Sequence, residues 1–161
     1  MKKILSALIL SGLAATASAA DTYGYLAFWQ NPSDSSDVLH IKTTRENLNQ
    51  LDASNELAAY CRGQDALAGV QKDQATGCQS VMPLQNTCVA VAYPRAHNRM
   101  TTENVVVISS PLFKNIHQTA ITQCSKKFGT EGQCAIEASY CTSSDYYGGA
   151  IKTLWSRIKS L

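Results

Sequence analysis

The sequence predicts an α+β domain organised as a tandem β-β-α-β repeat, with a mainly antiparallel sheet, two packed helices, a C-terminal helix and disulfide bonds. Two observations predict this fold class. Strand-like and helix-like segments recur in the same order in two halves, about residues 23–86 and 87–141, and an even number of cysteines, six, falls in these halves. Because each helix must bury an apolar face, we expect the helices to pack on one sheet or on two half-sheets.

The first half contains three expected strands. The apolar and aromatic run Tyr23–Trp29 is typical of a strand, and a polar turn over residues 31–36 separates it from a second strand, Val38–Ile41. A third strand begins at Cys78 and runs toward Asn86. This order predicts a hairpin and then, after a helix, a returning strand.

The helix of the first half precedes this third strand. Leu57 and Cys61 are four residues apart and share a helical face, and Gly63 is the expected end. Thr43 and Glu46 have the spacing of a capping box, which would begin the helix. The apolar period then breaks over residues 52–55, so the sequence leaves the start of this helix open.

The second half repeats the order. Cys88–Tyr93 and Val105–Ser109 are expected strands on either side of a long polar turn, residues 94–104, and Cys134–Cys141 is the last strand. Ser110 is the expected cap of the intervening helix. The residues that recur at helical spacing are Leu112, Phe113, Ile116, Ala120, Ile121, Cys124 and Phe128.

Both ends of this second helix carry sequence signals. Pro111 suits the first helical position, because its missing N–H would have no partner there. Lys126 and Lys127 suit the negative end of the helix dipole, and Gly129 is the expected end.

The N-terminus predicts a signal peptide over residues 1–20. A positive head with Lys2 and Lys3 precedes an apolar run over residues 4–15, and cleavage is expected after Ala19 or Ala20 because small residues precede it. A retained membrane anchor would need roughly 20 apolar residues. We therefore expect a single exported domain, residues 21–161, in the periplasm or secreted, with no integral membrane anchor.

Loss of the signal peptide also removes the net charge. Lys and Arg fall from 14 to 12 and then equal the 12 Asp and Glu. A nucleic-acid partner is not expected, because binding to phosphates needs a surplus of basic residues.

The cysteines are expected to form disulfides, because an even number in an exported domain meets an oxidising environment. A metal site is the weaker reading, since the chain has no C-x-x-C motif and its histidines lie outside ligand spacings. A catalytic thiol would leave one cysteine without a partner. We therefore expect no metal and no cofactor.

Superposing the halves predicts the pairing. Cys61 aligns with Cys124, since both lie near a helix C-terminus, and Cys78 aligns with Cys134, since both begin the next strand. One bond from helix to strand in each half leaves the other two cysteines, each at the end of that strand, to join the halves. The predicted bonds are Cys61–Cys78, Cys124–Cys134 and Cys88–Cys141.

The motifs Y-G-x-x-A-F, N-x-C-V-A-V-A and C-x-I-x-A-S-Y-C, with A-x-x-x-C once in each half, resemble the bacterial exported family known as domain of unknown function 4189. The resemblance covers roughly Tyr23 to Cys141. It implies a small exported domain with disulfide bonds in a bacterium, and it implies no agreed activity or catalytic residues. The residues that carry it are Tyr23, Gly24, Ala27, Ala58, Cys61, Cys78, Asn86, Cys88, Ala90, Ala120, Cys124, Cys134 and Cys141.

No enzyme motif is present: the chain lacks H-E-x-x-H, G-x-S-x-G, a P-loop and G-x-G-x-x-G. We expect no catalytic residues. His117 is expected beside the core on the second helix, and His40 in or beside a strand.

The loop containing Arg95, His97 and Arg99 is the first candidate for partner binding. It is basic, whereas the corresponding turn of the first half carries Asp34 and Asp37. One interpretation is a solvated turn, and the other is a recognition loop for an acidic partner.

The C-terminal tail, residues 148–161, is the second candidate. Its apolar stripe includes Trp155 and is typical of a helix. The helix would either dock on the sheet or present Trp155 to a membrane or a partner groove.

Together these features predict an exported non-catalytic binding protein, such as an inhibitor or immunity-type protein acting on another protein of the bacterial envelope. The alternative is a structural factor of the envelope or surface, and an enzyme of unknown type comes third.

Overall fold

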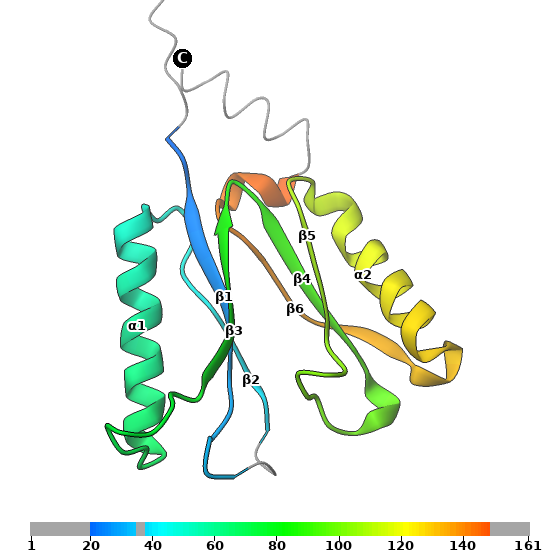
Figure 1. Cartoon of the computed structure of the whole chain (residues 1–161). Helices are drawn as coiled ribbons and strands as arrows, with labels where there is room; N and C mark the ends of the chain where they lie inside the picture. The colour runs from blue at the N-terminus through cyan, green and yellow to red at the C-terminus, as the bar shows by residue number, and fades with distance from the viewer. Residues whose placement is uncertain (1–19, 35–37, 149–161) are drawn as a thin grey trace, which may run out of the picture.

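Two three-stranded antiparallel sheets lie between two helices in the computed structural model, which describes residues 20–34 and 38–148 (Figure 1). The first sheet has the order β2-β1-β3, with β1 at Tyr23–Trp29, β2 at His40–Thr43 and β3 at Cys78–Gln85. The second has the order β5-β4-β6, with β4 at Cys88–Pro94, β5 at Val106–Ser110 and β6 at Cys134–Cys141. The helices are α1 (Gln50–Leu67) and α2 (Phe113–Phe128).

The α+β fold class and the tandem repeat are thereby confirmed, in the form of two half-sheets. In each sheet the first strand of the half is central and the other two flank it. The register shifts at the same place in both, after Leu26 in β1 and after Val91 in β4. The predicted tail beyond Gly148 and the signal peptide up to residue 19 lie outside the described residues.

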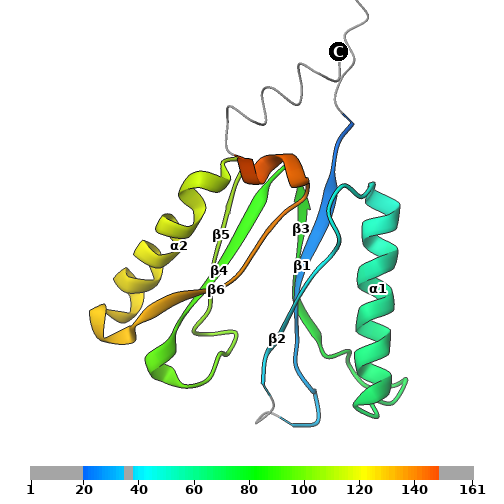
Figure 2. The same ribbon diagram turned by 180° about the vertical axis from the view of Figure 1, so that it is seen from behind.

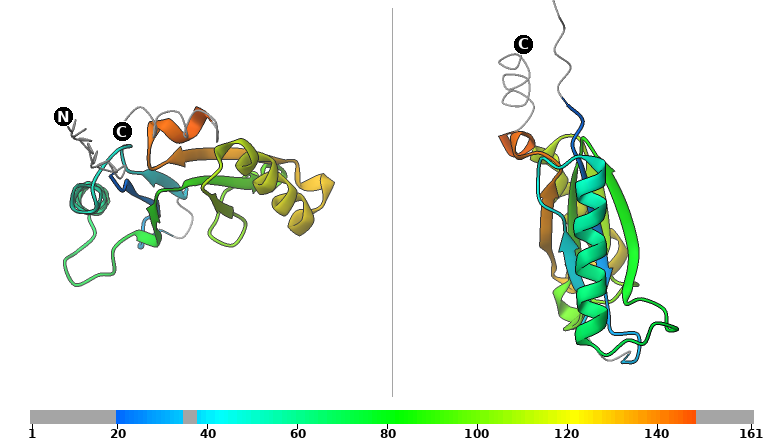
Figure 3. Two further views of the ribbon diagram at one scale, coloured as in Figure 1. Left: turned by 90° about the horizontal axis from the view of Figure 1, so that it is seen from above. Right: turned by 90° about the vertical axis from the view of Figure 1, so that its left-hand side faces the viewer.

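The layers are ordered α1, first sheet, second sheet, α2, with each helix on an outer face (Figures 1 and 3). The side chains of β4 alternate between the two faces of the second sheet, and this explains the order of the layers. Val89 and Val91 point toward the first sheet, whereas Ala90 and Ala92 point toward α2. The layer between the sheets contains Leu26, Phe28, Leu39, Leu84, Val89, Val91, Met100 and Tyr140.

The helices are attached differently. On α2, Ile116, Ala120 and Cys124 are fully buried against the second sheet. On α1 only Ala53 and Leu57 are buried. The first helix therefore depends more on polar contacts and on its disulfide than the second does.

Two carboxylates make the polar contacts of α1. Glu56 accepts hydrogen bonds from Lys42 Nζ at 3.1 Å and from Arg45 Nε at 2.9 Å. Near the other end of the helix, Asp65 Oδ1 accepts from Trp29 Nε1 at 2.8 Å and from the Gly77 N–H at 2.9 Å. Asp65 thus links β1 and the loop before β3 to α1, next to the helix-to-strand disulfide.

The structure corrects the expected limits of α1. Asn49 caps the helix by accepting a 2.9 Å hydrogen bond from the Asp52 N–H, so Thr43 and Glu46 do not begin it. The helix also continues through Gly63 to Leu67. A glycine costs a helix about 1 kcal/mol, which is too little to end one that is held by tertiary contacts on both sides.

Three further limits differ from the expectation. The strand β5 covers Val106–Ser110 instead of Val105–Ser109. The helix α2 begins at Phe113 and not at Pro111, because Ser110 is the last residue of β5 and its Oγ accepts from the Leu112 N–H at 3.1 Å instead of capping. Strand β2 begins at His40, because His40 pairs with Trp29, the last residue of β1, and Leu39 has no partner residue in that strand. Gly129 ends α2 as expected.

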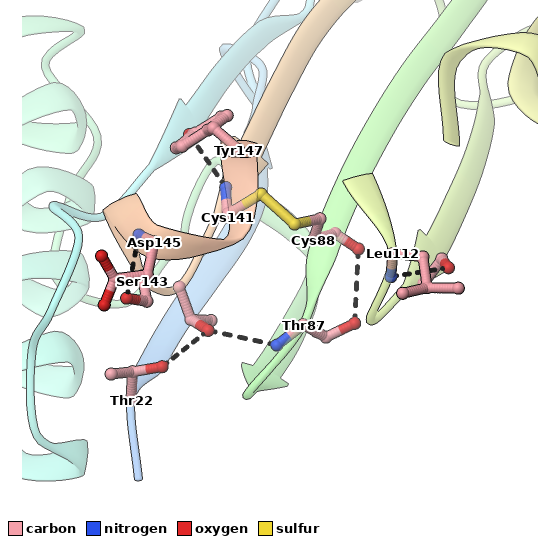
Figure 4. Close-up of a disulfide and its surroundings, with 10 residues drawn as sticks. Thr22, Thr87, Cys88, Leu112, Cys141, Ser143, Asp145 and Tyr147 are labelled. Atoms are coloured by element: carbon pink, nitrogen blue, oxygen red, sulfur yellow. Dashed lines mark hydrogen bonds between the residues drawn. A yellow bond between two sulfur atoms is a disulfide. The ribbon is translucent and has the colours of Figure 1, made fainter. Parts of the chain in front are cut away.

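The disulfides are Cys61–Cys78, Cys124–Cys134 and Cys88–Cys141, the same pairs that superposition of the halves predicts. The third bond does not join the halves. Cys88 begins β4 and lies opposite Cys141 at the end of β6, so this bond closes the second sheet (Figure 4). Each bond contributes roughly 2–4 kcal/mol by restricting the unfolded chain.

The strand register shows which residues of the first sheet correspond to the Cys88–Cys141 pair. In the first sheet Tyr23 lies opposite Gln85, and the Gln85 side chain donates a 3.2 Å hydrogen bond to the Tyr23 hydroxyl. A polar pair thus occupies the place of a disulfide. The flanking bonds repeat as well, from Asn86 N–H to Thr22 O at 3.0 Å and from Thr142 N–H to Thr87 O at 2.9 Å.

The halves are joined where Tyr140 of β6 reaches the first sheet. A Cβ at Gly24 would lie 2.9 Å from ring carbons of Tyr140, so the ring packs on a bare backbone. The Tyr140 hydroxyl donates to Arg45 O at 3.0 Å and lies 3.3 Å from Thr44 Oγ1. Burial raises the pKa of Tyr140 above its ordinary value, so this hydroxyl remains a donor over a wider pH range than that of an exposed tyrosine.

Replacing Gly24 with alanine should lower the free energy of unfolding by about 1–3 kcal/mol, because the new methyl group overlaps Tyr140. Gly63→Ala is the matched control. It lies inside α1 with no atom within 4 Å of the added Cβ, and it should stabilise by about 0.5–1 kcal/mol. Urea denaturation measures both, and equal effects of the two variants would contradict the contact.

Asp65→Asn should lower stability at pH 7 by about 1–2 kcal/mol, because the bonds to Asp65 are made by a charged acceptor. Burial alone would raise the pKa of Asp65, but bonds from Thr76, Trp29 and Gly77 outweigh it and hold the pKa below 3.8. The carboxylate therefore stabilises above about pH 4, and this contribution is lost as the pH falls through the folded-state pKa.

Denaturation curves at pH 7 and pH 2.5 test this. The difference between the wild-type protein and Asp65→Asn should shrink at the lower pH, while the exposed control Asp73→Asn should match the wild type at both. A gap that stays constant with pH would show that charge is not involved.

Candidate functional site

A groove of about 530 Å³ lies between the two sheets. It is bordered by β2 and β6, which are outer strands of their sheets and run along the same side of the molecule (Figure 2). The groove is lined by Val38, Leu39, His40, Ile41, Thr43, Tyr93, Asn98, Arg99, Met100, Glu137, Ala138 and Ser139.

The lining is apolar inside and charged outside. Leu39 and Met100 are buried, and Ile41, Tyr93 and Ala138 pack against the same inter-sheet core. The charged or titratable residues of the lining are His40, Tyr93, Arg99 and Glu137. A groove with an apolar floor and a few polar groups can hold an extended segment of chain or a small molecule.

Hydrogen bonds within the loop after β4 hold it against this groove. The chain forms a single 3-10 turn, η1 (Arg95–His97), and Asn98 then takes a left-handed conformation with φ 56°. The Asn104 side chain accepts from Thr101 N–H at 2.8 Å and donates to Arg99 O at 2.7 Å. The loop is thus preorganised, with Arg99 and Met100 on the groove.

The basic loop divides between the groove and the outer surface. Of the predicted binding residues, Arg99 lines the groove. Arg95 is exposed and outside the lining, and His97 packs edge-on against Phe128 with 5.2 Å between ring centroids. Trp155 lies outside the described residues.

Sequence reasoning missed the other side of the groove. His40 belongs to the lining from β2, but its ring lies 5.7 Å from that of Trp29, on the opposite face of the strand from Leu39 and Ile41. Glu137 lies at the register shift between β4 and β6, where an extra residue turns the edge of the strand. Neither the shift nor the approach of β2 to β6 has a signal in the sequence.

The cysteines and histidines each have defined neighbours in the structure. All six cysteines are in disulfides. His117 packs on Phe113 with ring centroids 4.9 Å apart, as His40 and His97 pack on their aromatic neighbours. Within residues 20–34 and 38–148, no three His, Cys, Asp or Glu side chains cluster as metal ligands.

In the same ranges, no helix has the length and apolar character needed to cross a bilayer. The three disulfides indicate a protein of an oxidising, extracytoplasmic compartment, because thiols stay reduced in the cytosol.

Comparison with known proteins agrees with the motifs. The model of one family matches residues 23–141, which include both sheets, both helices and all three disulfides. No curated protein and no solved structure matches the chain. The family match covers most of the chain and confirms the resemblance: the protein belongs to the family described as domain of unknown function (DUF4189).

Proposed function

We propose that this domain is an exported, non-catalytic binding protein that holds a segment of another protein in the groove between β2 and β6. In this role it acts as an inhibitor or immunity-type protein toward a protein of the bacterial envelope. The observation that carries the proposal is the groove itself, with its apolar floor, its charged rim and a strand edge on each side.

Strand edges favour a polypeptide as the ligand. An outer strand has one side that does not pair within its sheet, and an extended peptide can add to it through main-chain hydrogen bonds. Pockets for alternate side chains then give specificity. Here the floor residues Leu39 and Met100 would receive apolar side chains, and Arg99 would pair with a carboxylate.

Rigidity supports binding. The three disulfides and the Asn104 bonds hold the loop and both sheets in place before a partner arrives. A preorganised surface loses little conformational entropy on association. The predicted signal peptide, residues 1–20, fits a partner met outside the cytoplasm.

Arg99→Ala should weaken partner binding about tenfold, because an arginine on a groove is a favoured anchor of binding energy. Arg95→Ala is the matched control, since Arg95 lies on the same loop but outside the groove. The partner is first captured with a photo-reactive residue in place of Thr43, which lines the groove and lies opposite Leu26, so its side chain is on the sheet face toward the groove. The Kd of the captured partner is then measured by calorimetry.

A second photo-reactive protein carries the probe at Gln118, on the exposed face of α2. The proposal expects one adduct from position 43 and none of that size from position 118. Equal labelling from both positions, or equal losses for Arg95→Ala and Arg99→Ala, would show that the groove is not the binding surface.

A further inference from the structure

The two halves differ at one equivalent place, the outer face of the sheet beneath the N-terminus of its helix. In the second half a 3-10 segment, η3 (Ser144–Gly148), follows β6 and covers this place. The Tyr147 hydroxyl accepts from the Cys141 N–H at 3.0 Å (Figure 4), and its ring lies 4.8 Å from that of Phe113. Tyr146 is buried beside it.

In the first half the equivalent place is a pocket of about 250 Å³. Tyr23 and Gln85 occupy the positions of Cys88 and Cys141, and Gln50 is the first residue of α1 as Phe113 is of α2. After β3 the chain enters β4 within two residues, so no counterpart of η3 exists. The pocket is lined by Tyr23, Gly24, Tyr25, Gln50, Pro83, Leu84 and Gln85.

We infer that this pocket binds a tyrosine side chain of a partner protein, and we call it the first-half pocket. That side chain would take the place that Tyr147 takes in the second half. The pocket is smaller than the roughly 300–1,000 Å³ typical of drug-sized ligands, which suits a single aromatic ring. Tyr23, Tyr25 and Pro83 supply rings to the lining, and the side-chain oxygen of Gln85, whose Nε2 already donates to Asp21 and Tyr23, supplies an acceptor for a phenol hydroxyl.

The charge at the rim indicates what flanks the tyrosine. Asp21 accepts from Gln85 Nε2 at 3.1 Å and from Asn86 Nδ2 at 2.7 Å, which places a carboxylate beside the lining. The lining itself contains no lysine or arginine. The tyrosine is therefore expected next to a basic residue of the partner. This site is separate from the groove and does not depend on it.

Titration of the mature, oxidised protein with p-cresol, the side chain of tyrosine, tests the site by NMR. Shifts should concentrate on the amides of residues 23–25 and 84–85. Gln50→Phe gives the pocket the ring that Phe113 supplies in the second half, so p-cresol should bind about two- to tenfold more tightly. Leu51→Phe is the matched control, because Leu51 is 69% exposed and outside the lining.

Two acetylated peptides, Lys-Tyr-Gly and Glu-Tyr-Gly, test whether a basic residue next to the tyrosine strengthens binding. The basic peptide should bind more tightly, and Asp21→Asn should remove the difference. Arg99→Ala should leave p-cresol binding unchanged, which separates this site from the groove.

Three results would overturn the inference: p-cresol shifts located elsewhere, equal effects of Gln50→Phe and Leu51→Phe, or no preference between the peptides. A protein truncated after Gly148 tests whether the chain's own C-terminal segment is the ligand. If truncation raises p-cresol affinity more than tenfold, the pocket belongs to the chain's own C-terminal segment and not to a partner.

Discussion

The packing of the Tyr140 ring on the bare backbone of Gly24 is the contact on which the arrangement of the two sheets depends. No disulfide joins the halves, so the sheets are held face to face by this contact, by the apolar layer around it and by hydrogen bonds to Thr142 from Asn47 N–H at 2.8 Å and from Thr22 Oγ1 at 2.9 Å. The Tyr140 hydroxyl bonds to Arg45 O, and Glu56 holds the Arg45 side chain. One tyrosine therefore sets the spacing of the sheets and also positions the chain that leads from β2 into α1.

The two β-β-α-β units are stabilised by different kinds of interaction. The second half relies on apolar packing under α2 and on two disulfides, whereas the first uses one disulfide, the carboxylates of Glu56 and Asp65, and the Tyr23–Gln85 pair. Burial alone would raise the pKa of Glu56 and of Asp65. The hydrogen bonds that each carboxylate accepts favour its charged form, so both pKa values are lowered. The stability of the first half is consequently more sensitive to acid.

The order of elements could be predicted because strand alternation and helical spacing are local signals, and the cysteine pairs could be predicted because the same order recurs in both halves. The limits of α1 could not, because few of its residues are apolar and Asn49, rather than Thr43, supplies the cap. Superposing the halves put Cys88 and Cys141 at equivalent strand ends, whereas the strand register aligns Cys88 with Tyr23. Register depends on the bulge in β6, which leaves no mark in the residue pattern.

The two candidate binding surfaces lie where the repeat is broken. Because β2 corresponds to β5 and β6 to β3, the groove between β2 and β6 has a symmetry-related counterpart between β5 and β3. The hairpin that supplies Arg99 to the groove corresponds to one that carries Asp34, so the two sides differ in charge. The first-half pocket likewise exists because only β6 is followed by a segment able to cover its sheet. A duplicated scaffold can thus keep one copy of a contact for its own stability and leave the equivalent surface of the other copy open to a partner.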